Sequence, residues 1–166
     1  MATCGVSVLF GIAMVVATIV ILASGSQLPA EVASHFNGSG HADATMSRGA
    51  YLTVMAVLAN GVPVLTWWLQ HRAARLGRVN IPHREIWLAL ERRAETLRFM
   101  SRHAMAMSLA LLVLLVSVHL LVVKAHLAGE GRPVLDMHAF FAVLLGFVAF
   151  SLLWVTRLLR RFRCPR

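Results

Sequence analysis

Side chains that can bind a metal ion or relay protons gather in two short polar segments of this chain. One segment lies between the first two apolar stretches and the other between the last two. Histidine nitrogens and carboxylate oxygens are ligands that zinc and copper accept. The residues best able to converge are His35, Asp43, Asp136 and His138. The full set is His35, His41, His126, His138, Glu31, Asp43, Glu130 and Asp136.

The spacing of these residues matches no metal-binding signature. His35 and His41 are six residues apart, so they would not share one face of a helix. We therefore predict a hydrogen-bonded lock, in which His35 and Asp43 satisfy backbone groups and Asp43 or Glu31 pairs with Arg48. A metal site and a recognition surface for an outside partner stay open as alternatives, and no cofactor is predicted.

Two further polar residues, Asn60 and His119, fall inside apolar stretches. A polar side chain in hydrocarbon is costly unless it finds a partner, so both are candidates for function. Their expected depths in a bilayer differ by about 9 Å at 1.5 Å per helical residue, which argues against a direct relay. We predict hydrogen bonds between helices, with a proton or substrate path as the alternative.

Four apolar stretches must position these side chains, at about residues 6–23, 50–69, 104–123 and 139–155. Each approaches the ~20 residues that a helix needs to cross a bilayer. Because lipid offers the backbone no hydrogen-bond partner, each stretch should be a helix. The fold class is therefore all-α, a polytopic membrane protein. A single membrane domain, 1–166, would have an outer loop at 24–49 and a cytoplasmic segment at 70–103.

Arginine and lysine are distributed unevenly between the two sides of these stretches. Thirteen of the sixteen basic residues follow the second or the fourth stretch. Basic residues near membrane spans stay cytoplasmic, so both termini should be cytoplasmic and the membrane a cytoplasmic (inner) membrane. The expected partners are the anionic inner leaflet and another membrane protein or a second copy of this chain. Nucleic acid is not an expected partner, since the basic residues flank spans.

The cytoplasmic segment predicts a helix that starts near Asn80 and Pro82. Its apolar residues repeat at helical spacing, which is typical of a helix on a membrane surface. The stripe comprises Ile86, Trp87, Leu90, Ala94 and Leu97. Candidates for lipid or partner binding are Arg84, Trp87, Arg92, Arg93 and Arg98.

The outer loop is expected to contain a short helix on the membrane surface. Leu28 and Pro29 would begin it, and Leu28, Val32 and Phe36 recur at helical spacing. The run from Asn37 to Gly40 is a turn cluster. Ser47 would cap the second span.

The outer loop also carries a recognisable pattern, Leu-Pro-x-x-Val-x-x-His-Phe-x-x-x-Gly-x-x-Asp-x-x-x-Ser-Arg. Over about residues 6–70 the chain resembles the family called domain of unknown function 1648, which also forms the N-terminal part of SdpI-type bacterial membrane proteins. The resemblance implies a bacterial membrane protein and, through the SdpI type, toxin immunity or signalling. The matching positions are Leu28, Pro29, Val32, His35, Phe36, Gly40, Asp43, Ser47 and Arg48.

The preferred functional prediction is a non-enzymatic membrane protein. Its outer loop would recognise something outside, or the chain would be an accessory subunit of a membrane complex. No catalytic residue is assigned, because the sequence lacks a nucleophile triad, a phosphate-binding loop and a zinc-protease motif. The alternatives are a metal-dependent membrane enzyme that uses the outer His and Asp residues, and a small transporter that uses Asn60, Pro63 and His119.

Overall fold

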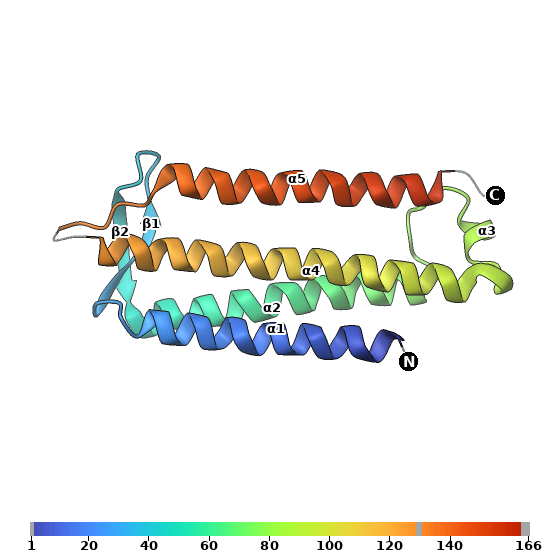
Figure 1. Ribbon diagram of the computed structural model, residues 1–166, viewed down its shortest axis with the longest axis horizontal. Coiled ribbons are helices and arrows are strands. Elements are labelled where there is room, and N and C mark those ends of the chain that lie inside the picture. The colour runs from blue at the N-terminus through green and yellow to red at the C-terminus, as the bar shows by residue number, and fades with distance from the viewer. Residues whose placement is uncertain (1, 129–130, 164–166) are drawn as a thin grey trace.

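Four long helices run side by side, and a β-hairpin covers one end of them (Figure 1). The computed structural model describes residues 2–128 and 131–163. We call the end with the hairpin the hairpin end, and the opposite end, where α1 begins and α5 ends, the basic end. In chain order the elements are α1 (Ala2–Gly25), β1 (Glu31–Phe36), β2 (Ala42–Ser47), α2 (Arg48–Arg75), α3 (Arg84–Trp87), α4 (Leu90–Leu127) and α5 (Met137–Phe162).

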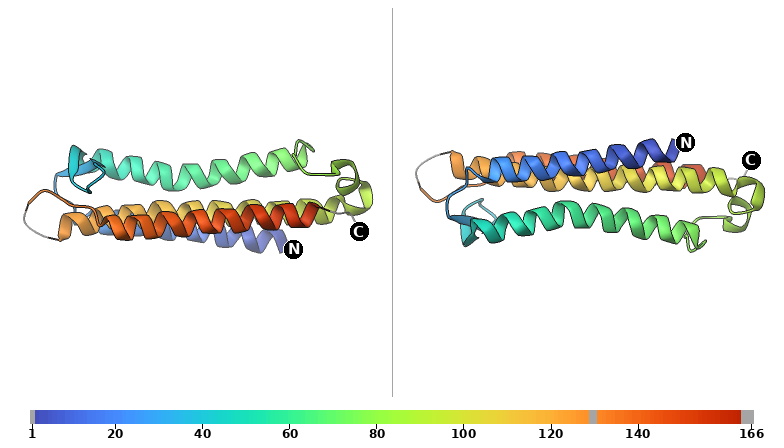
Figure 2. Two further views of the ribbon diagram at one scale, coloured as in Figure 1. Left: turned by 90° about the horizontal axis from the view of Figure 1, so that it is seen from above. Right: turned by 90° about the horizontal axis from the view of Figure 1, so that it is seen from below.

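The helices form two layers. Helix α4 lies between α1 and α5, and α2 packs from one side against α1 and α4 (Figures 1 and 2). Each of the four long helices contains a window that is long and apolar enough to cross a membrane. None of the residues in the window of α5 is buried within the protein. Apolar side chains turned outward are suited to lipid, so the chain is a mostly helical, multi-pass membrane protein, as predicted.

Helix α4 is longer than the predicted third span. It starts at Leu90 and comprises 38 residues, which corresponds to about 57 Å at 1.5 Å per residue. A bilayer core is only about 30 Å thick. The first turns of α4 therefore extend beyond the hydrocarbon region at the basic end, as one continuous helix with the span.

The outer loop is a two-stranded antiparallel hairpin, so the short surface helix predicted there is wrong. Val32 pairs with Met46 and Ala33 with Thr45. The register then shifts, because Ser34 on β1 has no partner of its own and Asp43 on β2 is likewise skipped. Such bulges break the simple alternation of a strand. Val32 and Ala33 are both buried, whereas His35 is exposed.

The segment between α2 and α4 is not one amphipathic helix. It contains α3, a helix of four residues, and Leu88 and Ala89 are not helical, so they separate α3 from α4. Trp87 is turned inward, 4% exposed, and its carbonyl accepts a 2.9 Å hydrogen bond from Thr96 Oγ1. Leu90 is 91% exposed. The apolar stripe is thus divided between two elements that face different ways.

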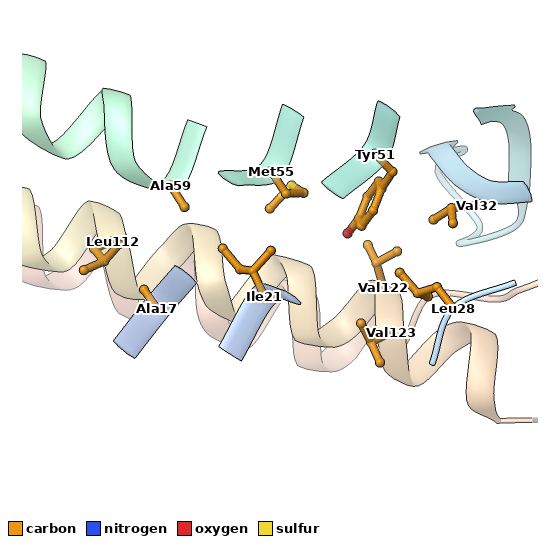
Figure 3. Packing of buried hydrophobic residues seen from close by; sticks show 10 residues of the cluster. All are labelled: Ala17, Ile21, Leu28, Val32, Tyr51, Met55, Ala59, Leu112, Val122 and Val123. Carbon is orange, nitrogen blue, oxygen red and sulfur yellow. The ribbon is translucent and has the colours of Figure 1, made fainter. Parts of the chain in front are cut away.

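The main core lies at the hairpin end, between α1, α2 and α4. Figure 3 shows side chains of α1, α2 and α4 meeting between the helices, with Leu28 and Val32 at the end nearest the hairpin. Ile21 and Val32 are fully buried. The cluster comprises Ala17, Ile21, Leu28, Val32, Tyr51, Met55, Ala59, Leu112, Val122 and Val123. A smaller cluster at the basic end joins Ile81, Trp87 and Phe162.

Candidate functional site

Several residues of the outer-loop pattern are structural. Leu28 is 2% exposed and belongs to the main core, and Phe36 packs against it half-buried. Pro29 lies in the short connection between α1 and β1. Leu28 and Phe36 seat the hairpin on the helices, so their burial explains why the pattern needs them. Pro29 is exposed.

Arg48, the first residue of α2, ties the base of the hairpin to the connection between α1 and β1. Its Nη1 donates to the carbonyls of Leu28 at 2.9 Å and Ser26 at 3.4 Å, and its backbone N–H donates to Ala30 O at 2.8 Å. The predicted pairing of Arg48 with Asp43 or Glu31 is therefore replaced by bonds to backbone carbonyls. Ser47 caps α2 as predicted, since Ser47 Oγ accepts from Ala50 N at 3.3 Å.

The turn of the hairpin is joined to the loop before α5. Asn37 Oδ1 accepts from the backbone N–H groups of Ser39 and His41, both at 3.0 Å. Gly40 has φ +84°, and its carbonyl accepts from Leu135 N at 2.8 Å. A Cβ at Gly40 would lie 2.6 Å from Leu135 O. The turn thus requires glycine for both its backbone conformation and its close approach.

His126 joins the hairpin to α4, and sequence reasoning gave it no particular role. Its Nδ1 lies 2.9 Å from Val122 O, which can only accept, so Nδ1 carries the proton. Its Nε2 then accepts the Ala33 backbone N–H at 3.1 Å. The neutral ring thereby holds β1 against the end of α4. The position of His126 at the C-terminal end of a span is the signal in the sequence that could have indicated this role. Its partner Ala33 could not be inferred, because it lies 93 residues away.

His35 and Asp43 form a pair on the outward face of the hairpin. His35 Nδ1 lies 2.5 Å from an oxygen of Asp43, and the two side chains are 68% and 46% exposed. The predicted lock, in which both side chains satisfy backbone groups, is therefore wrong: His35 and Asp43 bond to each other at the surface. An exposed pair of this kind adds little stability. Because both side chains are exposed, they are accessible to another molecule.

The remaining metal candidates do not join this pair. Asp136 caps α5 by accepting from Ala139 N at 3.0 Å and pairs with Lys124 at 3.2 Å. The Ala139 N–H, followed by Lys124, lowers the pKa of the Asp136 carboxyl. His138 is exposed at the start of α5, and Glu130 lies outside the described residues. Within residues 2–128 and 131–163 no three His, Cys, Asp or Glu side chains converge as metal ligands would.

His119 is fully buried where α1, α2 and α4 meet. Ser24 Oγ donates to Val20 O at 2.6 Å, so it accepts from His119 Nε2 at 3.0 Å. The other ring nitrogen, Nδ1, then accepts the Tyr51 hydroxyl at 3.1 Å. The ring therefore connects three helices, and each hydrogen bond of this network has one donor and one acceptor. Sequence reasoning identified His119 but neither of its partners.

Asn60, on α2, bonds to α1 in a network that is separate from that of His119. Its Nδ2 donates to Thr18 Oγ1 on α1 at 3.0 Å and to Ala56 O at 2.8 Å. Thr18 Oγ1 in turn reaches Met14 O at 2.9 Å. Both intramembrane polar residues thus make the predicted hydrogen bonds between helices.

Replacing His119 with leucine is expected to lower the free energy of unfolding by roughly 1–2 kcal/mol, because two hydrogen bonds within the membrane region are lost. A double-mutant cycle with Tyr51→Phe should give a positive coupling energy, because the two changes remove one shared bond. Unfolding of the detergent-solubilised protein by denaturant measures both values. His138→Leu, an exposed histidine changed in the same way, is the control and should be neutral. Strict additivity of the His119 and Tyr51 changes would contradict the network.

The arginines predicted to bind lipid or a partner are spread over the basic end. Arg92 lies over the Trp87 ring at 5.5 Å, and Arg93 Nη2 donates to Arg75 O at 3.4 Å. Arg84 is exposed on α3. Only Arg98 lines a cavity between α4 and α5, where it meets arginines of α5 that sequence reasoning did not single out.

Comparison with known proteins supplies a family for the first part of the chain. Residues 12–59, from within α1 to within α2, match the family described as Domain of unknown function (DUF1648). No curated protein and no solved structure matches the chain. The matched segment contains the hairpin, Arg48 and the His35–Asp43 pair. The similarity to this family therefore covers the hairpin and the parts of α1 and α2 that carry it.

Proposed function

We propose that this chain is a non-catalytic protein of the bacterial cytoplasmic membrane that binds a polypeptide partner with the outward face of its hairpin. The observation that carries the proposal is the exposed His35–Asp43 pair. Four other residues of the pattern stabilise the protein itself: Leu28, Gly40, Ser47 and Arg48. His35 and Asp43, although they belong to the same pattern, contribute little to stability and remain accessible.

The attachment of the hairpin supports a binding role. Arg48 fixes its base to the connection that follows α1, His126 fixes β1 to α4, and the bond from Leu135 to Gly40 fixes its turn to the loop before α5. A surface held at three places loses little conformational entropy on binding. This rigidity suits recognition of the kind that immunity and signalling proteins perform, and equally a subunit contact within a membrane complex.

The orientation of the proposed surface follows from charge. The hairpin end carries Arg48, Lys124 and Arg132, whereas thirteen basic residues belong to the other side of the spans. The basic end is then cytoplasmic, with both termini, and the hairpin faces outward. An external partner could reach His35 and Asp43 without crossing the membrane.

Site-specific photo-crosslinking in living cells tests the proposal. A photo-reactive amino acid at the exposed position Thr45 should yield a crosslinked partner that mass spectrometry can identify. The yield should fall at least about tenfold when His35 and Asp43 are both alanine, a loss expected when a close charged contact at an interface is removed. The His138→Ala variant, which alters an exposed histidine outside the hairpin, should keep the full yield.

The same cells provide the orientation control. A cysteine at Ser39, with Cys4 and Cys164 changed to serine, should react with an impermeant maleimide in intact cells. A cysteine at Glu85 should react only after permeabilisation. Crosslinking that is unchanged in the double alanine variant, or equally strong from position 85, contradicts recognition by the hairpin. Protection of Ser39 from the maleimide contradicts the orientation.

A further inference from the structure

A cavity of about 750 Å³ lies between α4 and α5 at the basic end. Two arginines of each helix line it, Arg98 and Arg102 on α4 and Arg157 and Arg161 on α5. Residues four apart lie one above the other on a helix, so each pair forms a column of positive charge. Glu95 is the one carboxylate among the lining residues, and four arginines against it leave a net charge of +3.

Part of this charge is already neutralised within the protein. Arg161 pairs with Glu95 at 2.6 Å and lies over the Trp87 ring at 5.0 Å. Arg98 Nε donates to Ala94 O at 3.2 Å. Arg102 and Arg157 are exposed and have no hydrogen bond or ion pair to any residue that the structure describes. Two guanidinium groups therefore border the cavity without an anionic partner.

The inner wall of the cavity is aromatic and holds one unsatisfied polar atom. The His103 ring is stacked between Trp154, at 4.1 Å between centroids, and Phe99, at 5.4 Å. His103 is 8% exposed, and its Nε2 has no hydrogen-bond partner among the described residues. Buried polar atoms are nearly always satisfied, so His103 Nε2 is available to bond a ligand in the cavity.

The polarity of the cavity changes along the helices. Ala106 and Phe150 line it further into the spans than the arginines do, together with Leu153, which is 71% exposed. The cavity is thus cationic toward the end of the bundle and apolar toward the middle of the membrane. An anion with an attached hydrocarbon chain matches this order, whereas a free anion would use only the cationic part.

We propose that this cavity binds the headgroup of an anionic phospholipid. Its phosphodiester lies between Arg102 and Arg157, an oxygen reaches His103 Nε2, and an acyl chain runs over Phe150 and Leu153. Planar guanidinium groups are well suited to phosphate oxygens because they offer two parallel N–H donors. The proposal is independent of the hairpin and its partner.

Native mass spectrometry of the purified full-length chain tests the site. The protein is released from detergent in the presence of dioleoylphosphatidylglycerol or dioleoylphosphatidylcholine. One phosphatidylglycerol should bind at least about tenfold more tightly than phosphatidylcholine, given two additional arginine contacts. Arg102→Gln combined with Arg157→Gln should abolish this preference. Arg84→Gln combined with Arg160→Gln removes the same charge from exposed positions outside the cavity and should retain it.

Two more measurements separate the possible explanations. The Arg102→Lys, Arg157→Lys variant, which keeps both charges, should recover part of the preference. Inorganic phosphate at millimolar concentration should not displace the lipid, since it cannot occupy the apolar part. If both glutamine variants lost the preference for phosphatidylglycerol equally, the overall positive charge of the protein would explain lipid binding, and the proposal would be overturned. Displacement by phosphate alone, or an unchanged preference in the cavity variant, would also overturn it.

Discussion

Replacing Phe162 with alanine is expected to free the end of α5 from the rest of the protein, at a cost of about 3–5 kcal/mol in local stability. Phe162 is 1% exposed, and its ring meets those of Trp87 and Phe99 edge to face, at 5.4 and 5.7 Å between centroids. The remainder of α5 buries little within the protein. The attachment of α5 to the rest of the protein therefore depends strongly on the contacts of Phe162.

Hydrogen exchange measured by mass spectrometry in nanodiscs checks this result. Peptides that cover α3 and the last turns of α5 should exchange faster in Phe162→Ala, while peptides of the hairpin should be unchanged. Leu159→Ala is the matched control, because Leu159 lies on the same part of α5 but is 55% exposed. Equal protection in Phe162→Ala and the wild type would show that the small cluster at the basic end does not hold α5.

Replacing Gly40 with alanine is expected to cost about 1–3 kcal/mol from left-handed backbone strain alone. The new Cβ would in addition lie 2.6 Å from the carbonyl oxygen of Leu135, so the turn must also move away from the loop before α5. That movement would break the 2.8 Å bond from Leu135 N to Gly40 O. The hairpin would then lose its attachment to α5.

Thermal unfolding of the protein in detergent measures the Gly40 effect. Gly38→Ala is a suitable control in the same turn, because no atom lies within 4 Å of a Cβ placed there and the residue has no positive φ. We expect a clearly lower midpoint for Gly40→Ala and a small change for Gly38→Ala. Similar midpoints for the two variants would be inconsistent with the close approach at Gly40.

The sequence predicted the membrane helices because their signal is strong and local. A run of apolar residues in α1 or α5 needs no knowledge of its neighbours, since lipid itself satisfies the requirement for burial. The extent of α4 was not predicted, because residues 90–103 are polar enough to be taken for a separate surface helix. In the structure the same residues continue the span without a break.

The hairpin was missed because its apolar residues fit two periods. Leu28, Val32 and Phe36 are four residues apart, which places them on one face of a helix but also, since four is even, on one face of a strand. The bulges at Ser34 and Asp43 further obscured the strand pattern. The sequence predicted that His35 and Asp43 would satisfy backbone groups, and it placed them together only in the metal-site alternative. Their exposure on the outward face was left open.

The other site residues depend on contacts between distant parts of the chain. His126 meets Ala33 across 93 residues, and His119 meets Ser24 across 95. The cavity at the basic end combines arginines from α4 and α5 that the sequence shows only as general positive charge. Such contacts follow from how helices pack, and no local pattern encodes them.

The unbroken course of α4 has a mechanical consequence. His126, which holds β1, and His103, at the wall of the cavity, are 23 residues apart on one helix, or about 35 Å. A helix without a proline or a break transmits axial displacement like a rod. A displacement of the hairpin would therefore act on both walls of the cavity, because α4 is attached to it through His126 and the start of α5 through Leu135.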